Sequence, residues 1–368
     1  MAKASSSKKI ITNNSLEFLK QYINNASPVG FETWGQKLWL EYVKPYIDTH
    51  YVDPYGTAVG IINPDNKFKV VIEAHADEIS WFVNHITSDG LIYLKKNGGV
   101  DHQTAPAARV FIHGKKGPVK AVFGWPAIHT RHGVPDQKEP HPKTDNLWLD
   151  CGARKKDEVE KLGIHIGAVV TYQDGFDELA NGNYIGRAMD NRVGGFMIAE
   201  VARLLKENKK KLPYGLYVVN AVQEEIGLRG AEMIARRIKP DVAIVTDVTH
   251  DTTTPMINKN VEGDVLCGKG PSLAYAPAVH NKLLGFVEKV ANDKKIPLQW
   301  RALSRSTGTD TDSFAYSNDG CPSVLISIPL RYMHTTVEML HRDDIENTIR
   351  LMYETLLTLT PKTNLSYL

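Results

Sequence analysis

Residues 218–231, with the sequence VVNAVQEEIGLRGA, place the strongest constraint on the fold. An apolar run rich in β-branched side chains, residues 216–222, is followed by the adjacent acids Glu224 and Glu225 and then by Gly227. This order predicts a buried strand that leads through two carboxylates into a helix. Because ligands and catalytic groups of open α/β sheets gather at the carboxyl ends of the strands, both acids are candidates for a functional site. An exposed pair of loop acids is the alternative interpretation.

Adjacent residues on an extended backbone point in opposite directions, which predicts different roles for Glu224 and Glu225, one on a metal ion and one on a water molecule. A second apolar run, residues 69–74, is followed by His75 and Asp77. On an extended segment these two side chains face the same side, so the carboxylate can orient the second ring nitrogen of a metal-binding imidazole. A strand-end histidine that simply pairs with a neighbour is the alternative.

Three more polar residues lie near the ends of predicted elements. Asp247 follows an apolar strand over residues 242–246, and His334 lies in a loop after the last apolar strand. Asp190 precedes a long helix over residues 193–206, where it either caps the helix or bridges two metal ions. Two imidazoles and several carboxylates, with no cysteine among them, fit a pair of divalent ions of the Zn, Co or Mn type.

Residues 85–184 differ from the rest of the chain in their pattern of polar and apolar residues. Short segments of alternating polarity lie between Gly, Pro, Asn and Asp turns, and the one candidate helix covers residues 155–162. This pattern predicts a small β-rich domain inserted between two halves of an α/β domain, residues 1–84 and 185–368. A length of 368 residues agrees with one large domain and one smaller one.

The amino-acid composition bears on which partners the protein binds and in which cellular compartment it is found. The net charge is +2 and the longest basic block is the short run at residues 209–211, so nucleic-acid binding is not predicted. The 3 cysteines have no CxxC spacing and cannot all pair, which favours a reducing compartment. The start MAKASSSKKI is polar and no long apolar stretch follows, which predicts no signal peptide, no membrane span and a cytoplasmic location.

The ordered set of motifs resembles one known family. AHADEIS, AMDNR, QEEIGLRGA, the TD pair at 246–247 and the His334 loop are similar to motifs of the M42 metallo-aminopeptidases, the TET, deblocking and glutamyl aminopeptidase group. The resemblance covers nearly the whole chain and includes SPVGFE at 27–32, DPYGTAVG at 53–60 and residues 147–170. The related M18, M20 and M28 families share the metal scheme, but GLRGA and the long insert favour M42.

The resemblance implies a fold and a metal centre. The fold is of the α/β class, a three-layer α/β/α catalytic domain of the binuclear metallopeptidases, with a small β-barrel-like dimerisation domain inserted at residues 85–184. Two divalent ions, Zn or Co with Mn as a further possibility, are expected in each subunit. His75 and Asp247 would bind one ion, Glu225 and His334 the other, and Asp190 would bridge them.

The resemblance also implies roles outside the metal ligands. Glu224 would be the general base that takes a proton from water, and Asp77 would orient His75. A late loop on the substrate side is expected to bind substrate through three residues: Gly308, Thr309 and Asp310. Ser80 stands where the family usually has glycine after the DEI triplet, which raises a question about the backbone there.

The function that follows is a metal-dependent aminopeptidase that removes N-terminal residues from short peptides. The resemblance alone implies homo-oligomers, with a dimer as the building block and a tetrahedral dodecamer as one possible assembly. An amidase or deacylase of the M20 or M28 type is the nearest alternative, and a non-catalytic metal-binding scaffold is a more distant one, which the retained Glu224 disfavours. An acidic substrate would require a basic pocket residue, for which Arg301, Arg305 and Arg331 are candidates, although each can equally be a surface charge.

Overall fold

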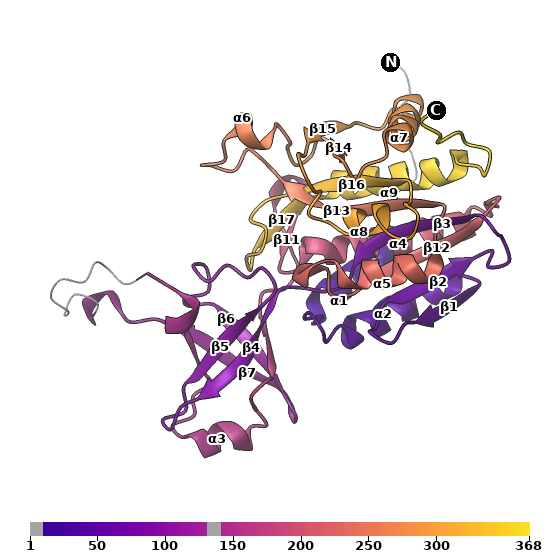
Figure 1. The fold of residues 1–368 in the computed structure, drawn as a ribbon. Coiled ribbons are helices and arrows are strands. Elements are labelled where there is room, and N and C mark those ends of the chain that lie inside the picture. Colours follow the sequence, from indigo (N-terminus) through magenta and orange to yellow (C-terminus); the bar gives the residue numbers. More distant parts are fainter. Residues whose placement is uncertain (1–9, 131–140) are drawn as a thin grey trace.

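The computed structural model describes residues 10–130 and 141–368. A large α/β body and a smaller β-barrel lie side by side, and the chain crosses between them twice (Figure 1). Within the described ranges, no helix combines the length and the apolar character needed to cross a bilayer.

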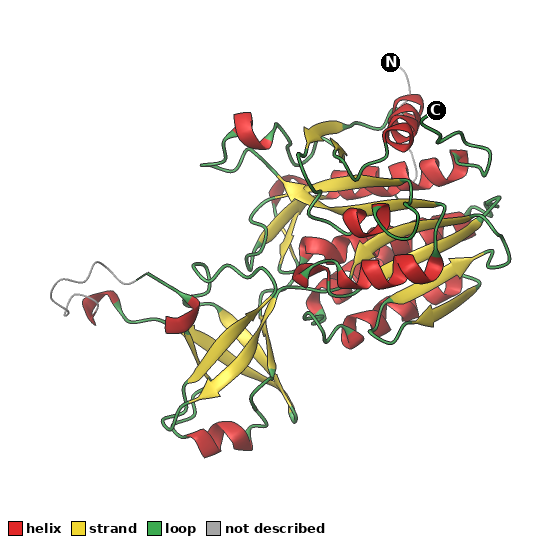
Figure 2. Ribbon diagram, in the orientation of Figure 1, coloured by secondary structure: helices red, strands yellow, loops and turns green. Residues whose placement is uncertain are grey.

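An eight-stranded mixed sheet forms the centre of the large body (Figure 2). Its middle strands run parallel to one another and are almost completely buried, which explains their nearly continuous apolar sequences. In spatial order the strands are β1 (Thr49–Val52), β2 (Ala58–Ile62), β12 (Gly215–Ala221), β3 (Lys69–His75), β13 (Val242–His250), β16 (Ser323–Leu330), β14 (Ser272–Tyr275) and β15 (Gln299–Ala302).

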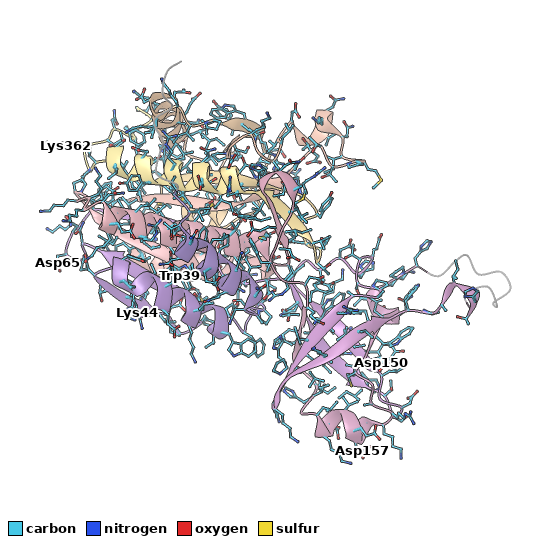
Figure 3. All side chains as sticks on the ribbon, turned by 180° about the vertical axis from the view of Figure 1, so that it is seen from behind. Trp39, Lys44, Asp65, Asp150, Asp157 and Lys362 are labelled. Carbon is cyan, nitrogen blue, oxygen red and sulfur yellow. The ribbon has the colours of Figure 1, made fainter. Side chains whose placement is uncertain are left out.

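Helices cover both faces of this sheet and complete the predicted three-layer α/β/α fold. On one face α4 (Met189–Glu207) packs against β3 and β13 and is surrounded by α1 (Asn13–Asn24), α2 (Thr33–Val43) and α9 (Arg342–Thr358), with α7 (Asn281–Lys294) beside α9. On the other face α5 (Arg229–Ile238) packs against β12, and α8 (Thr311–Ala315) against β13 and β16. Trp39 of α2, labelled in Figure 3, is fully buried and donates its indole N–H to the carbonyl of Gly195 in α4 at 2.8 Å.

The inserted segment forms a closed six-stranded barrel, with Asp150 and Asp157 marking it in Figure 3. Trp81, Phe123 and Tyr172 lie in a hydrophobic core that is separate from the core of the large body. In barrel order the strands are β4 (Ser80–Ile86), β5 (Ile92–Asn97), β8 (Trp148–Asp150), β7 (Gly117–Gly124), β6 (Arg109–Gly114) and β9 (Val169–Tyr172), and α3 (Lys156–Lys161) follows β8 in sequence.

The predicted start of the insert at residue 85 falls inside β4. The barrel strand begins earlier, at Ser80, because Trp81 and Val83 already alternate into the barrel core. Ser80 itself is buried in extended backbone, pairs with Asn97 of β5, and accepts a hydrogen bond from the Asn97 amide at 2.8 Å. The serine is thus accommodated by its barrel partner, and its backbone has no left-handed conformation that would require glycine.

A small antiparallel sheet brings the chain back from the barrel to the large body. It contains β10 (Asp177–Glu178), β11 (Asn183–Gly186) and β17 (Glu338–His341). β11 leads directly into the start of α4, and β17 follows the loop after β16, so the pairing of Gly186 with Glu338 joins two segments that are distant in sequence.

Candidate metal centre and active site

The predicted site residues converge at the carboxyl ends of the middle strands. His75 is the last residue of β3, and the turn that carries both glutamates follows β12, whose final residue pairs with His75. β13 does not end at residue 246 as predicted but continues to His250, because its outer part pairs with β16. Asp247 therefore projects from within a strand, where its side chain lies 3.7 Å from the Nε2 atom of His75.

The backbone at the glutamate pair differs from the prediction. Glu224 and Glu225 do not lie on an extended segment but begin a 3₁₀ turn, entered through a left-handed Gln223 at φ 58°. Asp77 fixes this turn, because its two carboxylate oxygens accept the backbone N–H groups of Glu224 and Glu225 at 3.0 and 3.1 Å. Asp77 also lies 3.4 Å from the Nδ1 atom of His75, the position expected of a carboxylate that orients the imidazole.

Asp190 lies between the two histidines. Its Oδ1 atom is 3.1 Å from His75 Nε2, and its Oδ2 atom is 3.4 Å from His334 Nε2. The backbone of Asp190 is not helical, and its side chain makes no cap for α4, so the capping alternative is excluded. His334 Nε2 is also 3.4 Å from Glu225 Oε2. The two carboxylate oxygens of Asp190 thus face the two histidines, one oxygen toward His75 and the other toward His334.

The donor atoms fit metal ions of the predicted type. Among the described residues, one group consists of His75, Asp190 and Asp247, and a second of Asp190, Glu225 and His334, with the offered atoms of each group within 4.8 Å of one another. A third group consists of His75, Glu224 and Glu225. The distances between these atoms therefore do not decide whether Glu224 binds a metal ion or acts as a base. Nitrogen and carboxylate oxygen donors without sulfur suit Zn, Co or Mn.

Comparison with known proteins identifies the family to which this chain belongs. The sequence model of the M42 glutamyl aminopeptidases matches residues 56–351. The chain belongs to the M42 family. It is therefore a peptidase of the aminopeptidase class.

Individual relatives are similar to this M42 chain in sequence and in fold. A lysyl aminopeptidase of Pyrococcus furiosus is 32% identical over 348 residues, which cover 94% of this chain and 97% of that protein. The crystal structure of a TET aminopeptidase from a marine Thaumarchaeota archaeon has a TM-score of 0.91 at 32% identity and covers 95% of this chain and 98% of that chain. The Pyrococcus horikoshii TET1 peptidase, described as assembling into a tetrahedron or a large octahedral shell, shares the fold with a TM-score of 0.82 at 24% identity, over 94% and 100% of the two chains.

Burial and charge shift the pKa values of several ionisable groups of the M42 site. Burial alone would lower the pKa of His334, but hydrogen bonds and charge from Asp190 and Glu225 outweigh it and raise the pKa to about 12. Burial raises the pKa of Asp247 to about 7 and that of Glu224 to about 11. Without a metal ion, Glu224 and His334 therefore retain protons at neutral pH. Asp190 does not, because hydrogen bonds from His334 and His75 outweigh its burial and lower its pKa. Because metal ligands must be deprotonated, ion binding at this site is expected to release protons.

A cavity of about 670 Å³ opens over the M42 site. Gly308 and Thr309 lie in its wall, where the sequence predicted substrate contacts. Asp310 does not line the cavity: it is 1% exposed and lies beneath the wall. Burial, followed by the charge of neighbouring Glu73, raises the pKa of Asp310 well above its usual value. Gly308 and Thr309 are thus placed where they could contact a substrate, as predicted, whereas Asp310 is not.

Two residues near His334 were not predicted from the sequence. The carbonyl of Gly99, just after barrel strand β5, lies 2.9 Å from His334 Nδ1, so the inserted domain helps to orient this imidazole. A Cβ atom at position 99 would lie 2.7 Å from the His334 ring, which explains the need for glycine. Glu338 is 1% exposed and accepts two backbone N–H groups, that of Asp190 at 3.0 Å and that of His334 at 2.8 Å.

Glu338 thereby connects the backbones that carry two of the candidate metal ligands. His334 has a left-handed φ of 62°, and Asp190 has a non-helical conformation at the start of a helix, so neither position is fixed by regular hydrogen bonding. The two oxygens of a single buried carboxylate supply the missing acceptors. The sequence signal was weak: Glu338 is an acid at the start of a short strand, and its role depends on the pairing of β17 with β11.

Glu338→Gln is expected to weaken metal binding by roughly 10- to 100-fold, the usual range for residues that orient metal ligands. An amide has only one acceptor atom, so one of the two backbone N–H groups would face an NH₂ group. The change is measured by titrating Zn²⁺ or Co²⁺ into the purified apoprotein. Glu41→Gln, an exposed acid of α2, is the matched control and should leave the affinity unchanged. Equal affinities for both variants would contradict the role assigned to Glu338.

Proposed function

We propose that this M42 chain is a two-metal aminopeptidase that removes N-terminal residues from short peptides. The observation that carries the proposal is Asp190, which belongs to two groups of three potential ligands and has one carboxylate oxygen facing each histidine. His75, Asp190 and Asp247 would hold one ion, and Asp190, Glu225 and His334 the other. Zn or Co suits these donors best, and Mn is compatible.

When bound, the two ions would lower the pKa of a water molecule and polarise the scissile carbonyl. The base is then Glu224, which lines the cavity and whose side chain is 11% exposed. Its position is determined by the Asp77 hydrogen bonds to the turn, and its Oε2 atom lies 3.8 Å from His75 Nε2. Dications nearby favour the ionised form of this carboxylate, which can take a proton from water and return it to the leaving amine.

Relatives leave the preferred N-terminal side chain open, because the family description names a glutamyl enzyme and the P. furiosus protein is a lysyl enzyme. Gly308 and Thr309 are proposed to contact the substrate, since they form part of the cavity wall near the candidate ligands.

The proposed polarity of cleavage is tested with a panel of aminoacyl amides that have free or acetylated N-termini. Protein loaded with Zn²⁺, Co²⁺ or Mn²⁺ should hydrolyse the free series and leave the acetylated series intact, and chelation should abolish the activity. Equal rates on both series would favour an amidase or deacylase over the aminopeptidase. Activity that survives complete removal of metal, verified by elemental analysis, would contradict the two-metal proposal.

Glu224→Gln should lower kcat by roughly 10²- to 10⁴-fold, the usual scale for loss of a general base, while the protein still binds two ions. Steady-state kinetics and metal analysis of the same preparation measure both properties. If Glu224 were instead a metal ligand, the metal content would fall together with the rate. The matched control is Glu232→Gln, since Glu232 lies on the partly exposed side of α5 and should leave both values unchanged.

We also propose that the chain forms homo-oligomers that contain dimers, in line with the assembly described for the TET1 peptidase that shares its fold. The barrel carries partly exposed apolar side chains such as Val122, Leu162 and Ile166, which would be available to a second copy. Light scattering coupled to size-exclusion chromatography should give a mass that is an even multiple of 41.0 kDa. A monomer at micromolar concentration would contradict this assembly.

A further inference from the structure

The active-site cavity extends well beyond the candidate metal ligands, as far as Arg301 at the edge of the central sheet. Arg301 lies on the edge strand β15 and lines the cavity together with Asp190 and His334. Among the described residues of this wall it is the only arginine or lysine. Because a guanidinium stays protonated in proteins, Arg301 is the one side chain that gives the cavity a permanent positive charge.

The hydrogen bonds of Arg301 are incomplete. Its side chain is only 13% exposed, and its buried Nε atom has no hydrogen-bond partner among the described residues. The carboxylate of Glu262, in α6 (Lys259–Glu262), faces it with Oε2 at 3.9 Å from an Nη atom. This distance is too long for a hydrogen bond, and the Glu262 side chain is 44% exposed, so the pairing is weak. A buried guanidinium with an unpaired donor is unfavourable unless a ligand supplies an acceptor.

The sheet order gives the distance between Arg301 and the metal centre. β16 and β14 lie between β13, which carries Asp247, and β15. Since neighbouring strands are about 4.8 Å apart, three spacings put β15 roughly 14 Å from β13. Two extended peptide residues cover roughly 7 Å of this width, and the Arg301 side chain reaches across the remainder. The side chain of an N-terminal Asp or Glu, with one or two methylene groups, is too short for the same span.

The wall between the metal centre and Arg301 is suited to an uncharged stretch of peptide. Apolar side chains make up part of it: Leu228, Val248, Leu303 and Met333. The acid Asp312 already accepts the backbone N–H groups of Thr307 and Gly308 at 3.0–3.2 Å. Partial burial, followed by the positive charge of Arg301, lowers the pKa of His250, which therefore stays neutral. A carboxylate that enters this end of the cavity thus meets Arg301 as its charged partner.

We propose that Arg301 binds the C-terminal carboxylate of a short peptide, so that the enzyme prefers tripeptides, whose carboxyl group ends within the cavity. The inference rests on the proposed aminopeptidase function and adds the chain length of its substrates. With the scissile carbonyl at the metal centre, the carboxylate two residues further on would accept both Nε–H and Nη–H, the bidentate geometry that arginine provides. Amidated tripeptides lack the charge, and longer peptides carry it past Arg301.

The test uses tripeptides that begin with the residue favoured in the aminoacyl amide panel and continue with two glycines. With the metal-loaded enzyme, kcat/KM for the free acid should exceed that for the C-terminal amide by roughly 10- to 100-fold, the effect of hydrogen bonds between charged groups. The difference should lie in KM, because the carboxylate takes no part in the chemical step. Pentapeptides of the same series should react at similar rates as acid and as amide, since their carboxylate lies beyond Arg301.

Arg301→Gln should lower kcat/KM for the tripeptide acid to the value for its amide. Arg305→Gln is the matched control, because Arg305 is exposed, lies four residues further along and does not line the cavity. This variant removes the same charge and should retain the wild-type ratio of acid to amide.

Equal kcat/KM values for the tripeptide acid and amide with the wild-type enzyme would overturn the inference and leave the aminopeptidase function intact. This comparison needs no variant and so does not depend on the folding of any. A preference for the acid that persists in Arg301→Gln would also overturn it, since another group would then bind the carboxylate. Failure to hydrolyse any unblocked aminoacyl amide or peptide would instead contradict the aminopeptidase function, and the inference with it.

Discussion

The burial of several carboxylates at one edge of a parallel sheet is the constraint on which the rest of this structure depends. Asp190, Glu224, Glu225 and Asp247 lie in a poorly solvated site where like charges repel. Among the described residues, only His75 and His334 are close enough to offset these charges. Protons can neutralise such a group in part, as the raised pKa values of Glu224 and Asp247 indicate. Divalent cations neutralise it more completely, and the two groups that share Asp190 provide places for them.

Two further buried carboxylates determine where these ligands stand. Asp77 accepts the backbone N–H groups of the glutamate turn, and Glu338 accepts those of Asp190 and His334. Both oxygens of each carboxylate accept a backbone N–H group, and the segments that donate these groups are not held by regular helix or strand hydrogen bonds. The ligand positions are therefore determined by hydrogen bonds between side chains and backbone. The barrel takes part as well, through the Gly99 carbonyl at the His334 ring.

The sequence predicted those features that depend on local patterns. Apolar runs predicted the buried parallel strands, and the residues just after them, such as His75 and Glu225, do meet at one edge. It failed where distant pairing decides the local backbone. Asp77 bends the glutamate pair into a 3₁₀ turn, and β16 extends β13 beyond Asp247, which no local pattern reveals. Glu338 was missed for the same reason, since its partners lie far away along the chain. The individual roles of the ligands stay predictions until metal binding is measured.

The position of the barrel in the chain has a consequence for the order of folding. β3 lies between β12 and β13, and both neighbours follow the barrel in sequence. During synthesis from the N-terminus, the apolar strand that ends in His75 has no partner on either side until the whole insert has been made. Pairing at such sequence separation is slow, and unpaired apolar edges promote aggregation. Rapid folding of the barrel, which brings its two ends together, would shorten the period in which β3 is exposed.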